Sequence, residues 1–181
     1  MIKKELLRKL IHFLGLGYIP LYLKFGKEVT LFVVVISTLL AIIIELLRHR
    51  VGIIPRILLR DYEIRGFGAY VYFGISATIV TALLPMESCI VAIVVASLGD
   101  GISGIVKQIN KAYSSISMFI FSFSFLIFLS FYINLRLFPA FFACILATLT
   151  ERIQKVGKYY INDNLSVPIV SALTHYLASL I

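Results

Sequence analysis

Long runs of apolar residues dominate the chain, and short polar segments separate them. A helix needs roughly 20 mostly apolar residues to cross the hydrocarbon core of a bilayer, and several runs approach that length. Because the hydrophobicity is continuous rather than alternating, it favours helices over the strands of a barrel. The pattern predicts seven helices, over residues 10–25, 29–47, 67–84, 88–106, 115–135, 137–151 and 166–181.

Composition indicates that a lipid bilayer is the solvent of these helices. Hydrophobic residues make up 60% of the 181 residues, and charged residues only 14%. One soluble core cannot bury that much apolar surface, so the remainder must face lipid. We therefore expect an all-α fold, a polytopic transmembrane helical bundle that forms a single integral membrane domain over residues 1–181.

Positive charge is distributed unevenly between the two sides of this seven-helix arrangement. Fourteen Lys and Arg residues fall on the side of the N-terminus, and three fall on the other side. The positive-inside rule therefore places the N-terminus and this charged face in the cytoplasm, in a multi-pass protein of the cell membrane. The asymmetry also explains the net charge of +8 without nucleic acid as a partner.

Acidic residues gather on the same face, although the positive-inside rule makes no demand for them. Asp100 lies in the fourth apolar run, where an ionisable side chain is costly and marks a candidate functional site. We expect one polar helical face there, because residues recur at three- and four-residue steps: Ser97, Asp100, Gly104, Lys107 and Lys111. Three glycines in the same segment permit the close approach of a helix or a phosphate: Gly99, Gly101 and Gly104.

Further ionisable side chains lie at the predicted ends of other helices on this face. Two pairs of opposite charge are one helical turn apart: Glu45 with Arg48, and Glu151 with Lys155. Asp163 and Asn164 immediately precede the last helix, where they suit either a helix cap or a metal ligand. Carboxylates and cations at one membrane face suit a magnesium-bound polyphosphate, with oxygen ligands on the metal and Lys or Arg on the phosphates.

Three separated motifs and one pair contain most of these residues. The motifs are Arg8-Lys9-x-x-His12, then Gly99-Asp100-Gly101 with Gly104, and then Glu151 followed by Asp163-Asn164-Leu165-Ser166-Val167-Pro168; the pair is Glu45 and Arg48. Together they resemble the CTP-dependent polyprenol kinases, the family of dolichol, phytol and related isoprenoid-alcohol kinases. The chain departs from that family where a Lys-Ser-x-Glu-Gly-Ser element is usual, because residues 111–117 lack its acidic residue and its glycine.

The resemblance implies that the γ-phosphoryl group of CTP is transferred, with Mg²⁺ as cofactor, to the hydroxyl of a membrane isoprenoid alcohol. The alcohol would be a long-chain one of the dolichol, phytol or geranylgeraniol type. The implied catalytic residues are Asp100, Asp163 and His12, and the implied metal ligands are Asp100, Asp163 and Asn164. The implied phosphate partners are Arg8, Lys9, Arg48, Gly99, Gly101, Gly104, Lys107 and Lys111. Glu45 and Glu151 are expected to orient these cations.

Two other functions remain open at this point. A membrane CTP:lipid-phosphate cytidylyltransferase would use the same nucleotide, metal and membrane face, but the Arg-Lys-x-x-His and Asn-Leu-Ser-Val-Pro elements argue against it. A transporter, which is not an enzyme, is expected to show internal repeats and broken helices that meet at the membrane midplane. The sequence contains no such repeat.

Overall fold

The computed structural model describes residues 9–10, 12–51, 66–153, 155–156 and 159–181. Apart from turns, the described residues are helical except for two short strands, β1 (Lys155–Val156) and β2 (Tyr159–Tyr160). The two strands pair antiparallel, with Lys155 opposite Tyr160. The expected all-α fold is therefore confirmed, with this minimal hairpin as its one departure among the described residues.

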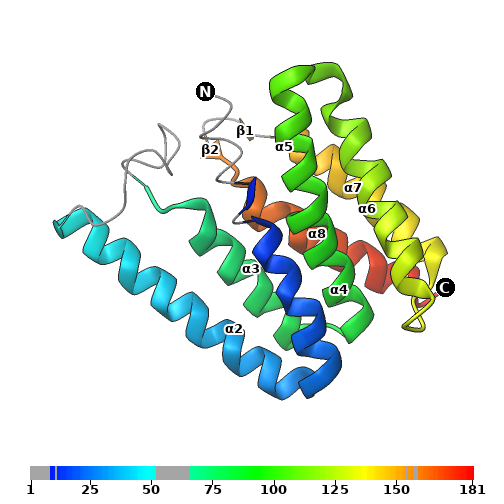
Figure 1. The fold of residues 1–181 in the computed structure, drawn as a ribbon, viewed down its shortest axis with the longest axis horizontal. Helices are drawn as coiled ribbons and strands as arrows, with labels where there is room; N and C mark the ends of the chain where they lie inside the picture. The colour runs from blue at the N-terminus through cyan, green and yellow to red at the C-terminus, as the bar shows by residue number, and fades with distance from the viewer. Residues whose placement is uncertain (1–8, 11, 52–65, 154, 157–158) are drawn as a thin grey trace.

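The chain begins with a helical arm that turns sharply into a long helix. Helical residues around His12 lead into a 3₁₀ turn, η1 (Gly15–Gly17), and then into α2 (Tyr18–Val51). Inside α2, Gly26 has a φ of 79° and a ψ of −177°, a conformation that is essentially restricted to glycine. The described residues of 9–25, here called the N-terminal arm, therefore run in a different direction from residues 27–51 (Figure 1). The break falls between the predicted helices 10–25 and 29–47.

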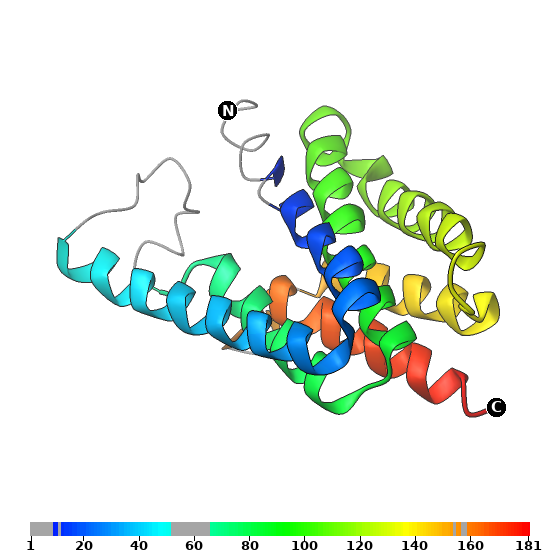
Figure 2. The ribbon, with the colours of Figure 1, turned by 60° about the horizontal axis from the view of Figure 1, so that its bottom comes forward.

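A buried helix stands at the centre of the bundle. After α3 (Ala69–Leu83), the chain forms α4 (Met86–Val94), a π-helical turn η4 (Val95–Gly99) and α5 (Asp100–Ile109). Every residue from Cys89 to Val95 has an exposed fraction of 0%, because α4 packs against α2, α3, α6 and α8. Figure 2 shows the N-terminal arm running beside this central helix, and η1 contacts both α4 and η4.

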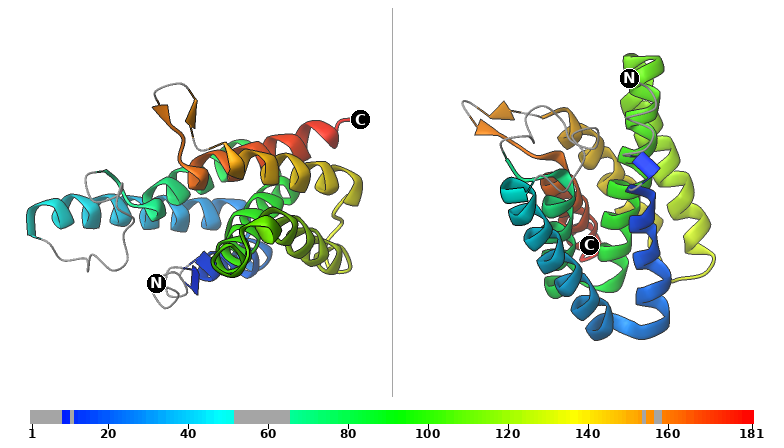
Figure 3. Two further views of the ribbon diagram at one scale, coloured as in Figure 1. Left: turned by 90° about the horizontal axis from the view of Figure 1, so that it is seen from above. Right: turned by 60° about the vertical axis from the view of Figure 1, so that its left-hand side comes forward.

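The remaining helices complete the bundle on the other side of the central helix. They are α6 (Ser114–Ser130), which follows a 3₁₀ turn η5 (Lys111–Tyr113), α7 (Leu137–Arg152) and α8 (Asp163–Ala178). α6 packs on α5 and α7, while α8 packs on α3, α4 and α7. The views of Figure 3 show α7 and α8 running together away from the hairpin.

The outer faces of the bundle are apolar. On α2 the exposed side chains include Phe32, Ile36, Leu40 and Leu47. Among the described residues, three helices are long and apolar enough to cross a membrane, at His12–Arg50, Met86–Ile109 and Lys111–Ser130, and Ala69–Leu83 is a shorter apolar helix. These helices indicate a membrane protein, while the count of seven spans and the orientation stay predictions.

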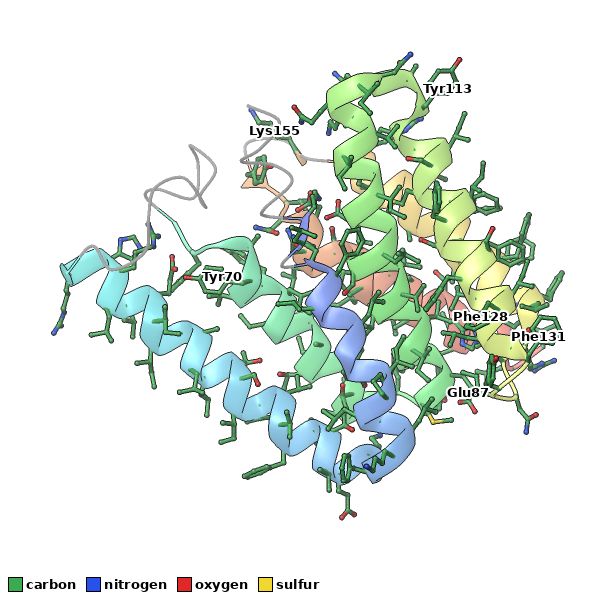
Figure 4. The ribbon with its side chains drawn as sticks, in the orientation of Figure 1. Tyr70, Glu87, Tyr113, Phe128, Phe131 and Lys155 are labelled. Carbon is green, nitrogen blue, oxygen red and sulfur yellow. The ribbon has the colours of Figure 1, made fainter. Side chains whose placement is uncertain are left out.

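Polar groups collect toward one end of the molecule, here called the polar end. It contains the end of α2, the start of α3, the end of α5, the hairpin and the start of α8 (Figure 1). In Figure 4, Tyr70 and Lys155 lie toward this end at the upper left, and Glu87 and Phe131 lie toward the opposite end at the lower right. The sequence placed the same segments on one face.

Gly26 gives the first prediction. Replacing it with Ala puts a Cβ on a backbone conformation that costs about 1–3 kcal/mol, which lowers the melting temperature by roughly 2–12 °C for a chain of this size. The measurement is thermal unfolding of the detergent-purified protein. Gly17→Ala is the matched control, because a Cβ at Gly17 meets no atom within 4 Å. Equal melting temperatures for the two variants would contradict the bend.

Candidate active site

A buried ion pair joins the N-terminal arm to the start of α5. The Lys9 side chain is 1% exposed, and its Nζ lies 2.7 Å from Oδ2 of Asp100. The same ammonium donates to the main-chain oxygen of Asp100 at 2.9 Å. A charge removed from water must be paired and hydrogen-bonded, and Lys9 meets both conditions on one residue. The structure thus brings together two residues that are 91 positions apart in the sequence.

The glycines beside Asp100 give the neighbouring helices room. A Cβ on Gly104 would overlap Cε of Lys9 and lie 2.6 Å from its Nζ, so a larger residue there would displace the Lys9 side chain from its position beside Asp100. A Cβ on Gly101 would lie 2.7 Å from a ring carbon of Phe13 in the arm, and Gly99 faces Ser122 of α6. The expected close approach therefore involves helices, and contact between these glycines and a phosphate stays a prediction.

His12 lies between the π turn and the ion pair. Its Nδ1 is 3.6 Å from Oδ2 of Asp100, and its ring lies close to the main chain of Ala96 in η4. Single π turns within α-helices occur frequently at functional sites. The structure therefore brings together two of the implied catalytic residues, His12 and Asp100.

Glu151 brings α7 into the same region. It is 7% exposed, and its Oε1 accepts a hydrogen bond from Ser103 Oγ at 3.5 Å. Charges of the arm, α5 and α8 lie within electrostatic range of Glu151 and of His12. We name the whole set the ionisable cluster: Lys9, His12, Asp100, Lys107, Glu151 and Asp163.

The start of α8 fixes Asp163 through its neighbours. Asn162 is the N-cap, since its Oδ1 accepts a hydrogen bond from the Asn164 backbone N–H at 3.0 Å. The Asn164 side chain is buried and donates from Nδ2 to Asp163 Oδ1 at 2.8 Å. The capping role thus belongs to Asn162, and Asp163 sits in the first helical turn, where the helix dipole favours a carboxylate.

Glu45 and Arg48 form a second buried ion pair at the polar end. Arg48 Nε donates to Glu45 Oε1 at 3.1 Å, and Glu45 has an exposed fraction of 0%. Glu45 also accepts from the Gly68 backbone N–H at 3.0 Å and from the Tyr70 hydroxyl. Arg48 donates to the Gly66 main-chain oxygen at 2.7 Å. Tyr70 was missed in the sequence because no spacing relates it to Glu45.

Two predicted placements are wrong, and in both cases the helix ends before it reaches the lysine. α5 ends at Ile109 and Asn110 is extended, so Lys111 lies in the exposed turn η5 and not on the helical face of Asp100. α7 ends at Arg152, so Lys155 belongs to β1 and is not one helical turn from Glu151. Arg8 lies outside the described residues.

The serines that follow Lys111 take part in helix packing. Ser114 Oγ lies 2.8 Å from Ser103 Oγ, and Ser115 Oγ accepts a hydrogen bond from Arg152 Nε at 2.8 Å. This is the stretch that departs from the Lys-Ser-x-Glu-Gly-Ser element. Its serines bind α5 and α7 to the start of α6.

In the described part of the chain, no group of three or more His, Cys, Asp or Glu side chains could hold a metal by itself. Mg²⁺ is commonly bound by one or two carboxylates together with substrate phosphates and water. Asp100 and Asp163 are carboxylates of this kind, and Mg²⁺ stays a prediction.

Comparison with known proteins adds no assignment. No protein family, curated protein or solved structure matches the chain.

The Lys9–Asp100 pair gives the second prediction. Lys9→Met leaves a buried carboxylate without its ammonium partner, which costs about 3–5 kcal/mol and lowers the midpoint of thermal unfolding. Adding Asp100→Asn removes the charge, so the double variant is expected to be more stable than Lys9→Met alone. Lys24→Met is the control, because Lys24 is an exposed cation of the same arm. A melting temperature of Lys9→Met equal to that of Lys24→Met would rule out a stabilising pair.

Proposed function

We propose that the chain is a CTP-dependent kinase of long-chain isoprenoid alcohols. The observation that carries the proposal is the ionisable cluster of the apolar bundle. Lys9 and His12 lie 2.7 Å and 3.6 Å from the Asp100 carboxylate, and the other members are within electrostatic range of Glu151. The motifs around Lys9, Asp100 and Asp163 that resemble the polyprenol kinases supply the identity of the donor and the acceptor.

Phosphoryl transfer asks a protein mainly for positioning and for neutralisation of charge. Asp100 and Asp163, with Asn164, are the residues that would hold Mg²⁺, which neutralises phosphate charge when it is bound. Lys9 and Lys107 are the cations of the cluster, and Arg8 and Lys111 remain candidate phosphate partners. The guanidinium of Arg48 is already bonded to Glu45 and to the main-chain oxygen of Gly66. The Glu151 carboxylate, which accepts a hydrogen bond from Ser103, lies within electrostatic range of both lysines.

The reaction forms a bond between the alcohol oxygen and the γ-phosphorus of CTP. The bond from that phosphorus to the bridging oxygen breaks, CDP leaves, and the hydroxyl proton passes to a carboxylate. The two aspartates divide two roles, one as a metal ligand and the other as the base. His12, 3.6 Å from Oδ2 of Asp100, orients that carboxylate.

The membrane places the two substrates at one boundary. CTP is in the cytosol, and an isoprenoid alcohol lies in the bilayer with its hydroxyl at the interface. We therefore propose seven spans with the N-terminus in the cytoplasm, so that the polar end faces CTP. The excess of Lys and Arg on this side supports that orientation.

The third prediction concerns which phosphorus of CTP is attacked. With a free isoprenoid alcohol and CTP labelled at the γ-phosphorus, label is expected in a lipid monophosphate, and CDP is the other product. Asp163→Asn loses the charge needed to hold Mg²⁺ or to accept the hydroxyl proton, so it is expected to abolish turnover while the protein still purifies as a folded species. A CDP-lipid and pyrophosphate, formed from a lipid phosphate, would instead identify a cytidylyltransferase.

The fourth prediction concerns orientation. The native Cys89 and Cys144 are both buried, so a cysteine introduced at an exposed site dominates labelling by a membrane-impermeant thiol reagent. In intact cells Glu28→Cys is expected to be labelled, and Lys155→Cys is expected to be labelled only after permeabilisation. The reverse pattern would place the polar end outside the cell and exclude a site that uses cytosolic CTP.

A further inference from the structure

A cavity of about 430 Å³ opens at the polar end, between the segment that precedes α3 and the segment that joins β2 to α8. Three aromatic side chains line it, those of Phe67, Tyr72 and Tyr160, and a polar residue, Asn162, lies among them. Its other walls include Gly66 and Leu165. None of these residues belongs to the ionisable cluster or to the motifs of the resemblance except Leu165.

The cavity adjoins the ionisable cluster. Asn162 and Leu165 line it, and Asp163 lies between them in the sequence at the start of α8. Asp163 is within electrostatic range of both His12 and Glu151. The start of α8 therefore contributes residues both to the cavity and to the cluster.

The buried Glu45–Arg48 ion pair holds one wall of the cavity in place. Arg48 binds the main-chain oxygen of Gly66, and Glu45 binds the backbone N–H of Gly68 at 3.0 Å. Phe67 lies between these two anchored residues. On the other wall, Asn162 is fixed as the N-cap of α8. Walls that are fixed in advance reduce the entropy lost on binding.

The extent of the cavity indicates which of two kinds of ligand it can hold. Along the two helices its lining extends no further than Tyr72, in the first turn of α3, and Leu165, in the first turn of α8. It therefore stops within about one helical turn, 5.4 Å, of the helix starts. An isoprenoid chain needs a groove that runs along the helices, whereas a flat aromatic ring with polar edges needs aromatic faces and one or two polar partners.

We propose that this cavity binds the pyrimidine base of the nucleotide, with Phe67 and Tyr160 as stacking surfaces and Asn162 as a polar partner. The proposal rests on the proposed function, because it takes CTP as the donor. It gives Glu45 and Arg48 the role of positioning residues, which hold the Gly66–Gly68 wall and do not touch the phosphates.

The test compares ring-removing variants with a matched control. Phe67→Leu and Tyr160→Leu keep an apolar side chain but lose the ring, so each is expected to raise KM for CTP by roughly 5- to 100-fold. The value of kcat at saturating CTP and the KM for the alcohol stay unchanged. Tyr113→Leu removes a ring that is 60% exposed near the same end of the protein and outside the cavity, and it is expected to leave all three constants unchanged.

Two inhibitors separate the base from the phosphates. CMP carries the base, and inorganic tripolyphosphate does not, so the Phe67 and Tyr160 variants should weaken inhibition by CMP and leave inhibition by tripolyphosphate unchanged. Arg48→Lys keeps the charge but loses the planar fork that holds Gly66, and it should show the same pattern. Weaker inhibition by tripolyphosphate in Arg48→Lys would place Arg48 on the phosphates and overturn its positioning role.

The remaining outcomes distinguish a failure of the proposed base site from a failure of the proposed kinase function. If the wild-type protein converts CTP and alcohol to CDP and lipid phosphate, but the cavity variants behave like Tyr113→Leu, the base site is wrong and the kinase function stands. A rise in KM for the alcohol in place of CTP would assign the cavity to the lipid and overturn the proposal. Wild-type protein that neither binds nor turns over CTP would remove the proposed function itself.

Discussion

The polar end of this bundle depends on a buried ion pair between Lys9 and Asp100. Burial costs several kcal/mol for each ion, and only close geometry and extra hydrogen bonds repay that cost. Lys9 supplies both through contacts of 2.7 Å and 2.9 Å to one residue. Three other features follow from this pair: glycine at position 104, the place of His12 and the path of the N-terminal arm.

Two buried ion pairs connect helices that otherwise pack through apolar contacts. In lipid, apolar faces gain little from meeting each other, so close packing and hydrogen bonds decide how helices associate. Lys9–Asp100 joins the arm to the central helix, and Glu45–Arg48 joins the end of α2 to the start of α3. Both ion pairs lie at the polar end. The first holds the arm beside the ionisable cluster, and the second holds one wall of the neighbouring cavity.

The sequence predicted the helices well because apolar runs are long and the breaks between them are polar. Gly26 and Pro85 lie at turns that the pattern located, and Asp100 was identified by its cost in an apolar run. Helix ends were less accessible, since Lys111 and Lys155 each lie just past an end that no Gly or Pro marks. The partners of Asp100 and Glu45 were hidden for another reason: Lys9 and Tyr70 meet them through tertiary packing, which spacing along one helix does not encode.

The π turn at Val95–Gly99 has a consequence for how the central helix is built. Each residue of an α-helix rotates the next by about 100°, so a turn that accommodates one extra residue shifts the phase of everything after it. The segment before the turn is buried on all sides, so its rotation exposes no residue to a different environment. The segment after the turn must direct Asp100 and Gly101 toward the arm. Residues 86–109 therefore form one continuous helix with two helical registers. The direction of the Asp100 carboxylate depends on the number of residues before it as much as on their chemistry.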